Sequence, residues 1–299
     1  MRHAALFLVV AGACLAGPAA HGQDRPAAAP VALVWEATVH GSDGARLTAP
    51  VGVAALDGER IAVADADPPR LVLFRRGAAG WSPARVVRLP ATPAGIAAVA
   101  GRYAVSVRGT GAIYLVDPQD GAQRRLPLPR GTFAGPLAGT RDGRLAVVDL
   151  AQGRLLVVTP DGAEAGELPL PPLARDVADT GDGWLVAVPP RGQLVPVTRD
   201  GAIGEPVELP GVSPRPCWPA AVAVAPDGAR LVLDRSGGRI LLLDENADVV
   251  GDAGGRGWRD GRLMLPSDLA LAGPSRVVVA DQGNARVQVF RRTDGAAGR

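Results

Sequence analysis

Lysine is absent from this chain of 299 residues, and histidine, cysteine and aromatic side chains are scarce. All 32 positively charged side chains are therefore arginines, and 30 acidic side chains leave a formal net charge of only +2. Such a small net charge gives no support for a protein that binds nucleic acid or a membrane surface by charge. The three histidines are His3, His21 and His40, which disfavours a zinc site built from several histidines and a mechanism with a histidine base.

The N-terminal segment has the features of an export signal, predicted to span residues 1–22. An apolar stretch at 4–10 continues through small residues to position 16, and the segment Ala20-His21-Gly22 suits a signal peptidase, whose cleavage would make Gln23 the first residue of the mature chain. An alternative makes Cys14 the attachment point of a lipid, because small residues precede it, although the leucine usual three positions earlier is missing. Both alternatives predict a protein of the periplasm or cell envelope, with membrane contact only through a lipid anchor.

The rest of the chain predicts one domain behind a short tether. Residues 23–30 (QDRPAAAP) are expected to be a flexible tether and residues 31–299 a single folded unit. No later apolar run approaches the ~20 residues that a transmembrane helix needs. Cys217 would be the only cysteine left after removal of the signal, so no internal disulfide is expected, which is compatible with a bacterial periplasm. The 39 glycines and 28 prolines are spread between apolar runs, as turn residues would be.

What the chain has in abundance is a repeated strand pattern. Its best copy is ADQGNARVQVF at 280–290, where an Asp closes one apolar run and an Arg five residues later opens the next. Weaker copies without the charged pair lie at 107–112 and 188–193. The chain thus contains six units, spaced by about 40 to 47 residues. Each unit carries short strands separated by Asp-Gly turns. This pattern predicts an all-β fold, a six-bladed β-propeller. The charged pairs are Asp65/Arg70, Asp149/Arg154, Asp234/Arg239 and Asp281/Arg286.

The two ends of the chain predict how the ring closes. The last unit lacks a fourth strand, because residues 291–299 are polar and rich in glycine. The segment 31–39, with Trp35 at its centre, has a strand pattern and belongs to no unit. We expect it to pair with 286–290 as the outer strand of the last blade, which would remove an exposed sheet edge. A linear solenoid with capping terminal repeats is the alternative.

The last unit, from Gly251 to Phe290, resembles an NHL repeat. That family's pattern runs from a Gly-rich stretch (here Gly254-Gly255) through a Pro-x-Gly/Asp strand (here 266–268) to an Asp…Asn-x-Arg core (here 281–286). Blades one, three and five keep the Asp and Arg but lose the Asn, and blades two and four keep only the apolar frame. The resemblance implies a propeller of the NHL-repeat kind but no single chemistry, because such folds host both binding modules and enzymes.

Two kinds of polar residue in the repeats have different expected roles. The Asp…Arg pairs are expected to be hairpin architecture, with Asp accepting backbone N–H groups and Arg neutralising it. Alignment of the units places Asp176 and Asp268 where innermost strands begin, at the mouth of the channel. Two carboxylates there could hold a divalent cation such as Ca²⁺, completed by carbonyls and water, or they could cap nearby amides. The equivalent positions in the other blades are Gly52, Gly95, Pro136 and Ala221.

Enzymatic propellers can be compared with this inventory of residues. Gluconolactonase-type propellers place a Glu, an Asn and an Asp on a divalent metal. The corresponding stretch of the first blade, 49–52, contains no Glu, and Asn246 and Asn284 both fall in turns, which argues against a lactonase. Cys217 has no histidine partner and is expected to be a buried apolar side chain and not a nucleophile. No catalytic residue is predicted.

Four loops that lead into innermost strands are rich in Pro, Arg and Trp, and propeller connectivity brings them to one face. Arg and Trp are the residue types favoured in binding hot spots. A plain solvated rim is the alternative for this face. The loops span 126–133, 168–176, 209–219 and 255–266, and they carry Arg130, Arg175, Arg215, Trp218, Arg256, Trp258, Arg259 and Arg262.

The sequence thus favours an exported, monomeric, non-catalytic binding or scaffold module. Its expected partner is a protein, a peptide or an anionic glycan, recognised through the Arg/Trp/Pro-rich loops without a cofactor. The alternative is a divergent metal-dependent hydrolase or lyase that uses Asp176 and Asp268. Some NHL propellers bind RNA, but export and balanced charge argue against nucleic acid here.

Overall fold

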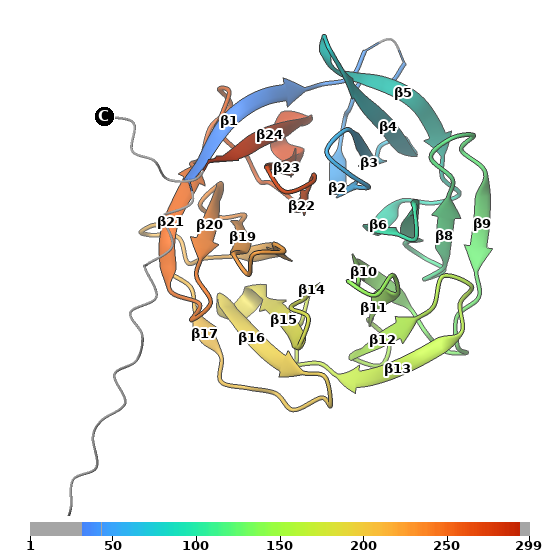
Figure 1. Ribbon diagram of the computed structural model, residues 1–299, viewed down its shortest axis with the longest axis vertical. Coiled ribbons are helices and arrows are strands. Elements are labelled where there is room, and N and C mark those ends of the chain that lie inside the picture. The colour runs from blue at the N-terminus through green and yellow to red at the C-terminus, as the bar shows by residue number, and fades with distance from the viewer. Residues whose placement is uncertain (1–31, 43, 294–299) are drawn as a thin grey trace, which may run out of the picture.

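A computed structural model describes residues 32–42 and 44–293 of the chain. The predicted signal, the possible lipid-bearing Cys14 and the tether at 23–30 lie outside these described residues. Within the described ranges, six four-stranded antiparallel sheets form a closed ring around a central axis (Figure 1). The predicted six-bladed β-propeller is therefore confirmed. The described part of the chain contains no helix long and apolar enough to cross a membrane.

The strands run from the axis outward in each blade. Blade one contains β2 (Pro50–Ala55), β3 (Arg60–Ala66), β4 (Pro69–Gly77) and β5 (Gly80–Arg88). Blade two contains β6 (Pro93–Val99), β7 (Arg102–Val107), β8 (Ile113–Val116) and β9 (Gln123–Leu126). Blade three contains β10 (Ala134–Gly139), β11 (Leu145–Asp149), β12 (Arg154–Val158) and β13 (Glu164–Pro169).

The second half of the ring repeats this arrangement. Blade four contains β14 (Asp176–Asp179), β15 (Gly183–Val188), β16 (Gln193–Thr198) and β17 (Val207–Glu208), with the short helix η1 (Pro189–Arg191) between its second and third strands. Blade five contains β18 (Pro219–Val224), β19 (Arg230–Asp234), β20 (Arg239–Leu243) and β21 (Val249–Gly254). Blade six contains β22 (Asp268–Leu271), β23 (Arg276–Asp281), β24 (Arg286–Thr293) and β1 (Ala32–Val39), with η2 (Gln282–Asn284) between β23 and β24.

The hydrophobic core lies between the blades. Second and third strands are runs of Val, Leu, Ile and Ala that are buried on both faces, as expected for strands that pack against a neighbouring sheet on each side. The buried side chains form six clusters within the described residues, each shared by two adjacent blades. Phe74, Tyr103, Trp184 and Phe290 are the largest side chains in these clusters. Stability therefore depends on contacts between blades, and a blade alone would expose both faces.

Blade six is completed by the N-terminal strand, as predicted. β1 pairs antiparallel with β24 from Ala32 opposite Thr293 to Val39 opposite Val287, with an irregularity between Trp35 and Ala37. Figure 1 shows the blue strand β1 beside the red strands of the same blade. Pairing of the first strand with the last closes the ring, so the linear solenoid is excluded.

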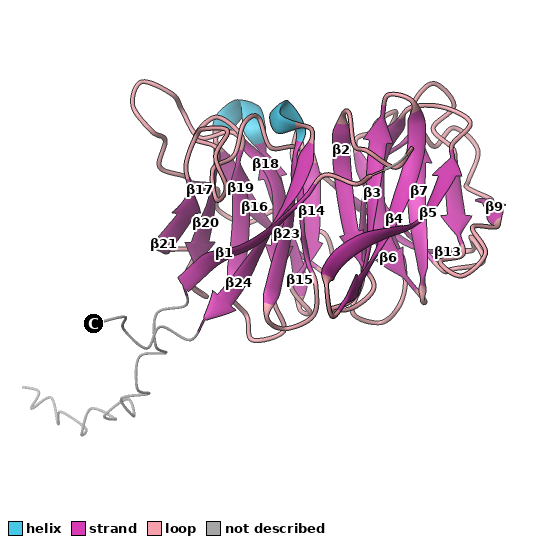
Figure 2. Cartoon of the chain, turned by 90° about the horizontal axis from the view of Figure 1, so that it is seen from above, coloured by secondary structure: helices cyan, strands magenta, loops and turns pink. Residues whose placement is uncertain are grey.

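The ring has two faces with different connections. One face, called the loop face below, carries the loops that lead into the innermost strands and the turns between second and third strands, including η1 and η2. Figure 2 shows η1 and η2 together at the upper edge of the ring. The opposite face, called the turn face, carries the short turns, several of which use a Thr-x-Asp-Gly sequence with a Thr hydroxyl bonded to the Asp. The predicted binding loops all belong to the loop face.

Candidate functional site

The four Asp–Arg pairs hold the loops that lead into blades one, three, five and six. Each Asp, at the end of a second strand, is completely buried and forms an ion pair with the Arg five residues later. Each Asp also accepts an N–H from the loop that leads into its own blade, 16 or 17 residues earlier. The ion pairs confirm the expected neutralisation by Arg. The expected bonds from the following turn are made to Asp149 and Asp234, whereas among the described residues Asp65 and Asp281 accept backbone N–H groups from the preceding loop alone. The donors in the preceding loops are Ala49 at 2.6 Å, Phe133 at 3.0 Å, Trp218 at 3.1 Å and Met264 at 2.7 Å.

The best copy of the repeat anchors the longest of these loops. The Arg286 guanidinium donates to the carbonyl oxygens of Arg259 and Arg262, both at 2.8 Å. The Asn284 amide donates to the Gly257 carbonyl at 3.0 Å and to the Asp281 carboxylate at 2.8 Å. Blade six alone keeps the Asn of the pattern. Its amide donates to the backbone of the loop at 255–266, which gives this Asn a structural role in blade six.

All the predicted arginines and tryptophans of the loops are exposed on the loop face. The Trp258 side chain is 74% exposed and Trp218 is 41% exposed. Within the described residues, five of the arginine side chains have no hydrogen bond or ion pair, whereas Arg262 donates to the Gly254 carbonyl at 2.7 Å. Guanidinium groups without partners remain available for a ligand. The five are Arg130, Arg175, Arg215, Arg256 and Arg259.

The arginines do not converge on one point but line separate grooves, each between a turn and the loop beside it. Arg130 and Arg125 line a groove of about 460 Å³ between blades two and three. Arg215, Arg256 and Arg262 line a groove of about 420 Å³ between blades five and six. Arg175 lines a smaller groove of about 210 Å³ and also the mouth of the channel.

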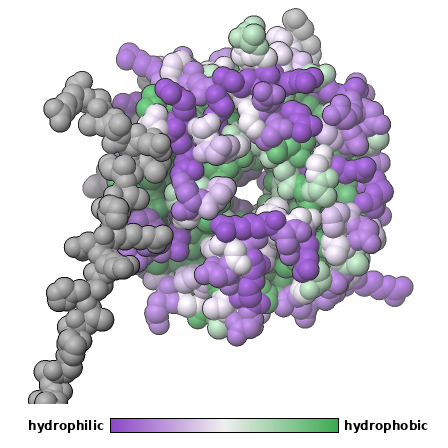
Figure 3. Space-filling view, viewed as in Figure 1, coloured by the Kyte–Doolittle hydropathy of each residue, from purple (hydrophilic) through white to green (hydrophobic). Residues whose placement is uncertain are grey.

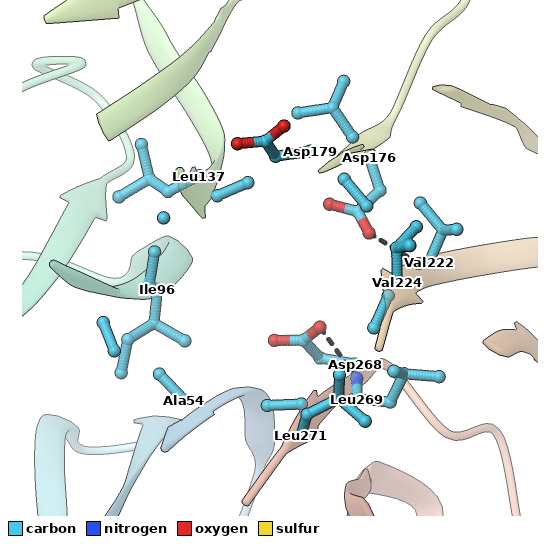
Figure 4. Close-up of a pocket in the computed structure, with 18 of the residues that line it drawn as sticks. Ala54, Ile96, Leu137, Asp176, Asp179, Val222, Val224, Asp268, Leu269 and Leu271 are labelled. Carbon is cyan, nitrogen blue, oxygen red and sulfur yellow. Dashed lines mark hydrogen bonds between the residues drawn. The ribbon is translucent and has the colours of Figure 1, made fainter. Parts of the chain in front are cut away.

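The central channel is the second candidate site. Figure 3 shows an opening in the middle of the ring, and the innermost strands enclose a volume of about 290 Å³ there. Its walls are mostly Val, Ala, Ile and Leu, and the carboxylates of Asp176 and Asp268 point into it near the loop face (Figure 4). The structure therefore brings the two predicted carboxylates to one channel.

Each of these carboxylates joins its own blade to the next one. Asp176 of blade four accepts the N–H of Val222 in blade five at 2.8 Å, and Asp268 of blade six accepts the N–H of Val53 in blade one at 2.8 Å. A Cβ on Gly52 would lie 2.8 Å from Ile96 Cγ2 and 3.3 Å from Asp268 Oδ2, so a larger residue in blade one would crowd both side chains. The expectation that these residues cap nearby amides is met by this geometry.

The surroundings of both carboxyl groups favour their protonated forms. Burial raises the pKa of Asp176 to about 7, although the bonds from the Val222 and Val177 amides oppose the shift. Burial also raises the pKa of Asp268 well above its usual value, and repulsion from Asp176 adds to this effect. Both side chains keep some solvent access through the channel. A protonated carboxyl is a poor ligand for a hard cation, so a metal would have to displace a proton.

The described residues contain no group of three or more His, Cys, Asp or Glu side chains placed to share a metal ion. A cation bound by Asp176 and Asp268 would therefore take its remaining ligands from backbone carbonyls and water.

The turn-face end of the channel holds a cluster that was not predicted. Asp179, at the end of β14, is buried and accepts the N–H groups of Arg141 and Gly181, both at 2.8 Å. It also pairs with Arg199, whose guanidinium lies 4.6 Å from the centroid of the Trp184 ring. The bond from the Arg141 N–H joins blade three to blade four. Arg141 and Arg199 both lie in Thr-Arg-Asp-Gly turns, but nothing in the sequence indicated that these two turns meet at Asp179.

Cys217 is buried, as expected, and its surroundings suppress reactivity. Burial raises the pKa of the thiol to about 12, and the nearby Asp234 carboxylate adds to the shift. We expect no reaction of a Cys14→Ser variant with a thiol reagent such as 5,5′-dithiobis(2-nitrobenzoate) at pH 8, and prompt reaction in denaturant, because the thiolate is the reactive form. Rapid reaction of the native protein would contradict the burial of this side chain.

Comparison with known proteins identifies the fold and no family. No family model matches the chain, and no curated protein matches it. Among solved structures, a gluconolactonase from Xanthomonas campestris has a TM-score of 0.64 at 18% identity, covering 91% of this chain and 100% of that one. A virginiamycin B lyase from Staphylococcus aureus has a TM-score of 0.58 at 13% identity, covering 88% and 99%. A protein of unknown function from Bacteroides thetaiotaomicron has a TM-score of 0.65 at 16% identity, covering 88% and 76%.

Proposed function

We propose that this chain is an exported, NHL-like propeller that works without catalysis, as a binding or scaffold module of the bacterial cell envelope. The observation that carries the proposal is the set of exposed arginines without partners on loops that are held rigidly from below. The Asp–Arg pairs and Asn284 fix the backbone of the loops before blades three, five and six, so the side chains of these three loops are presented with little loss of backbone entropy on binding. Exposed Trp218 and Trp258 add large aromatic surfaces to the same face.

The NHL-like assignment is supported by the hydrogen bonds that the characteristic residues of its pattern, Asp281, Asn284 and Arg286, make in blade six. These three side chains all form hydrogen bonds to the backbone of the loop at 255–266. In this blade the pattern therefore serves to hold a long loop. Blades that keep only Asp and Arg hold shorter loops by the Asp alone or by Asp and Arg together.

The alternative function is a metal-dependent hydrolase or lyase reaction at Asp176 and Asp268. In its favour, two carboxylates share one channel and two of the solved structures with the same fold are enzymes. Against it, each carboxylate already accepts an amide of the next blade, and burial favours the protonated form. Metal analysis of the purified protein separates the two functions. Tightly bound stoichiometric metal that is lost in Asp268→Ala would favour the enzyme.

Site-specific photo-crosslinking tests the binding function. A benzoylphenylalanine placed at Trp258 on the loop face should give a discrete protein or glycan adduct with an envelope extract of the source organism. The matched position is Arg144, an exposed side chain on the turn face, where no such adduct is expected. Equal labelling from both positions, or no adduct from either Trp258 or Trp218, would count against a binding loop face.

A further inference from the structure

We propose that the groove between blades five and six is a binding site for an acidic segment of a partner polypeptide. The groove lies on the loop face, with the loop before β18 on one side and the loop before β22 on the other. Arg215 belongs to the first loop, and Arg256 and Arg262 belong to the second. This assignment rests on the proposed binding function of the loop face and narrows it to one place and one kind of partner.

The charge of the groove is unbalanced. Arg215, Arg239, Arg256 and Arg262 line it, and Asp252 is the acidic residue among its lining side chains. Asp252 already pairs with Arg239 at 3.0 Å, and Arg239 also bonds to Asp234 and to the Pro210 carbonyl. The remaining arginines thus have no acidic partner within the described residues. Guanidinium groups bind carboxylates in a bidentate geometry, with charge-assisted hydrogen bonds on both oxygens.

The floor of the groove is backbone, which lets a ligand approach closely. Gly254 and Gly255 have φ values of +98° and +109°, a region that favours glycine. A Cβ on Gly255 would lie 2.3 Å from an Arg262 Nη, so the missing side chain leaves space for that guanidinium. Arg262 is held there by its bond to the Gly254 carbonyl at 2.7 Å.

The lining favours a polypeptide over a glycan. Apart from the arginines and the engaged Asp252, Ser236 is the one polar side chain among the lining residues. Sugar hydroxyls donate as well as accept hydrogen bonds, and this lining offers few side-chain acceptors, because Asp252 is engaged and the arginines only donate. Val212, 41% exposed, offers an apolar contact for a neighbouring peptide side chain. The volume of about 420 Å³ suits a few residues of an extended segment.

Fluorescence anisotropy with the full-length protein tests the proposal. The probe is a labelled short peptide of alternating Glu and Leu, and the same peptide with Gln in place of Glu is its neutral control. We expect the Glu peptide alone to bind, and to bind more weakly as ionic strength rises from about 0.05 M to about 0.5 M. Arg215→Gln and Arg256→Gln should each weaken binding about tenfold, because each removes a charge-assisted contact.

Matched variants locate the binding. Arg291→Gln removes the same charge from an exposed side chain at the opposite end of β24 and should change the affinity by less than about twofold. The side chains of Arg215 and Arg256 make no bonds within the described residues, so thermal unfolding of these two variants should match that of the unaltered protein.

Three results would overturn the proposal. If Arg130→Gln lowers the affinity for the peptide as much as Arg256→Gln does, the whole loop face binds by charge. The proposed binding function would then stand, but the assignment of the site to this groove would not. Binding of polygalacturonate through Arg256, without binding of the peptide, would make the occupant a glycan. If the peptide does not bind but crosslinking from Trp258 succeeds, only the assignment of a peptide site to this groove is refuted. If both experiments fail, the proposed binding function is refuted as well.

Discussion

Asp281→Ala is expected to lower the free energy of unfolding by about 3 to 5 kcal/mol. The Asp281 carboxylate is completely buried and accepts bonds from the Met264 N–H at 2.7 Å, the Asn284 amide at 2.8 Å and the Arg286 Nε–H at 2.8 Å. Its removal leaves the Arg286 guanidinium, 6% exposed, without its main counter-charge. A buried charge without a partner is far more costly than a lost surface contact.

Chemical denaturation followed by circular dichroism measures this effect. The matched control is Arg60→Ala, which breaks the ion pair between Asp57 and Arg60, whose side chains are 39% and 42% exposed, and leaves the turn bonds to the Asp57 carboxylate in place. That loss should be below about 1 kcal/mol, because solvent screens an exposed pair. Similar losses in both variants would show that Asp281 is not a structural anchor of the last blade.

Asp176→Asn is expected to stabilise the protein at pH 8 by about 2 to 4 kcal/mol. Burial raises the pKa of the Asp176 carboxyl from 3.8 to about 7, so the folded protein must ionise a group that its surroundings keep neutral. The contribution of this group to stability is complete below about pH 4 and is lost as pH rises through 7. Asn is neutral at every pH and can still accept the Val222 N–H, so it removes the cost above pH 7.

The pH dependence of unfolding is the decisive measurement. The unaltered protein should lose stability between about pH 4 and pH 8 from this group, and Asp176→Asn should flatten that slope. Asp142→Asn provides the opposite control, because the Thr140 hydroxyl lowers the pKa of the exposed Asp142 carboxyl and its replacement should not stabilise the protein. Destabilisation of Asp176→Asn at pH 8 with an unchanged slope would indicate an ionised carboxylate, as a bound cation would require.

The fold could be predicted because its determinants are local and repeated. Each Asp and its Arg are only five residues apart, and they mark the same turn in four of the six blades. The closing strand could also be predicted, because 31–39 had a strand pattern and the last unit had too few strands. Both features can be counted along the sequence without knowledge of distant contacts.

The site could be predicted only in outline. The sequence placed the loop arginines on one face, but whether Arg215 and Arg256 share a groove depends on two loops separated by a whole blade. The same limit applies to Asp179 and Arg199, which meet across the turn face of blade four, and to Asp268, whose amide donor Val53 lies at the other end of the chain. The first two cases depend on how neighbouring loops and turns lie in space, and the third depends on the contact between the last blade and the first; a local sequence pattern specifies none of these contacts.

The pairing of β1 with β24 also determines when, during synthesis of the chain, the ring can close. Thr38 and Gln288, which face each other in blade six, are 250 residues apart in the chain. A ribosome makes β1 first and β24 last, so the ring cannot close before nearly all of the chain has been synthesised. Until then β1 has no strand beside it and blade one has no neighbour on one side. A chain cut short before β24 would therefore keep blade one uncovered on one side, however completely the other blades had folded.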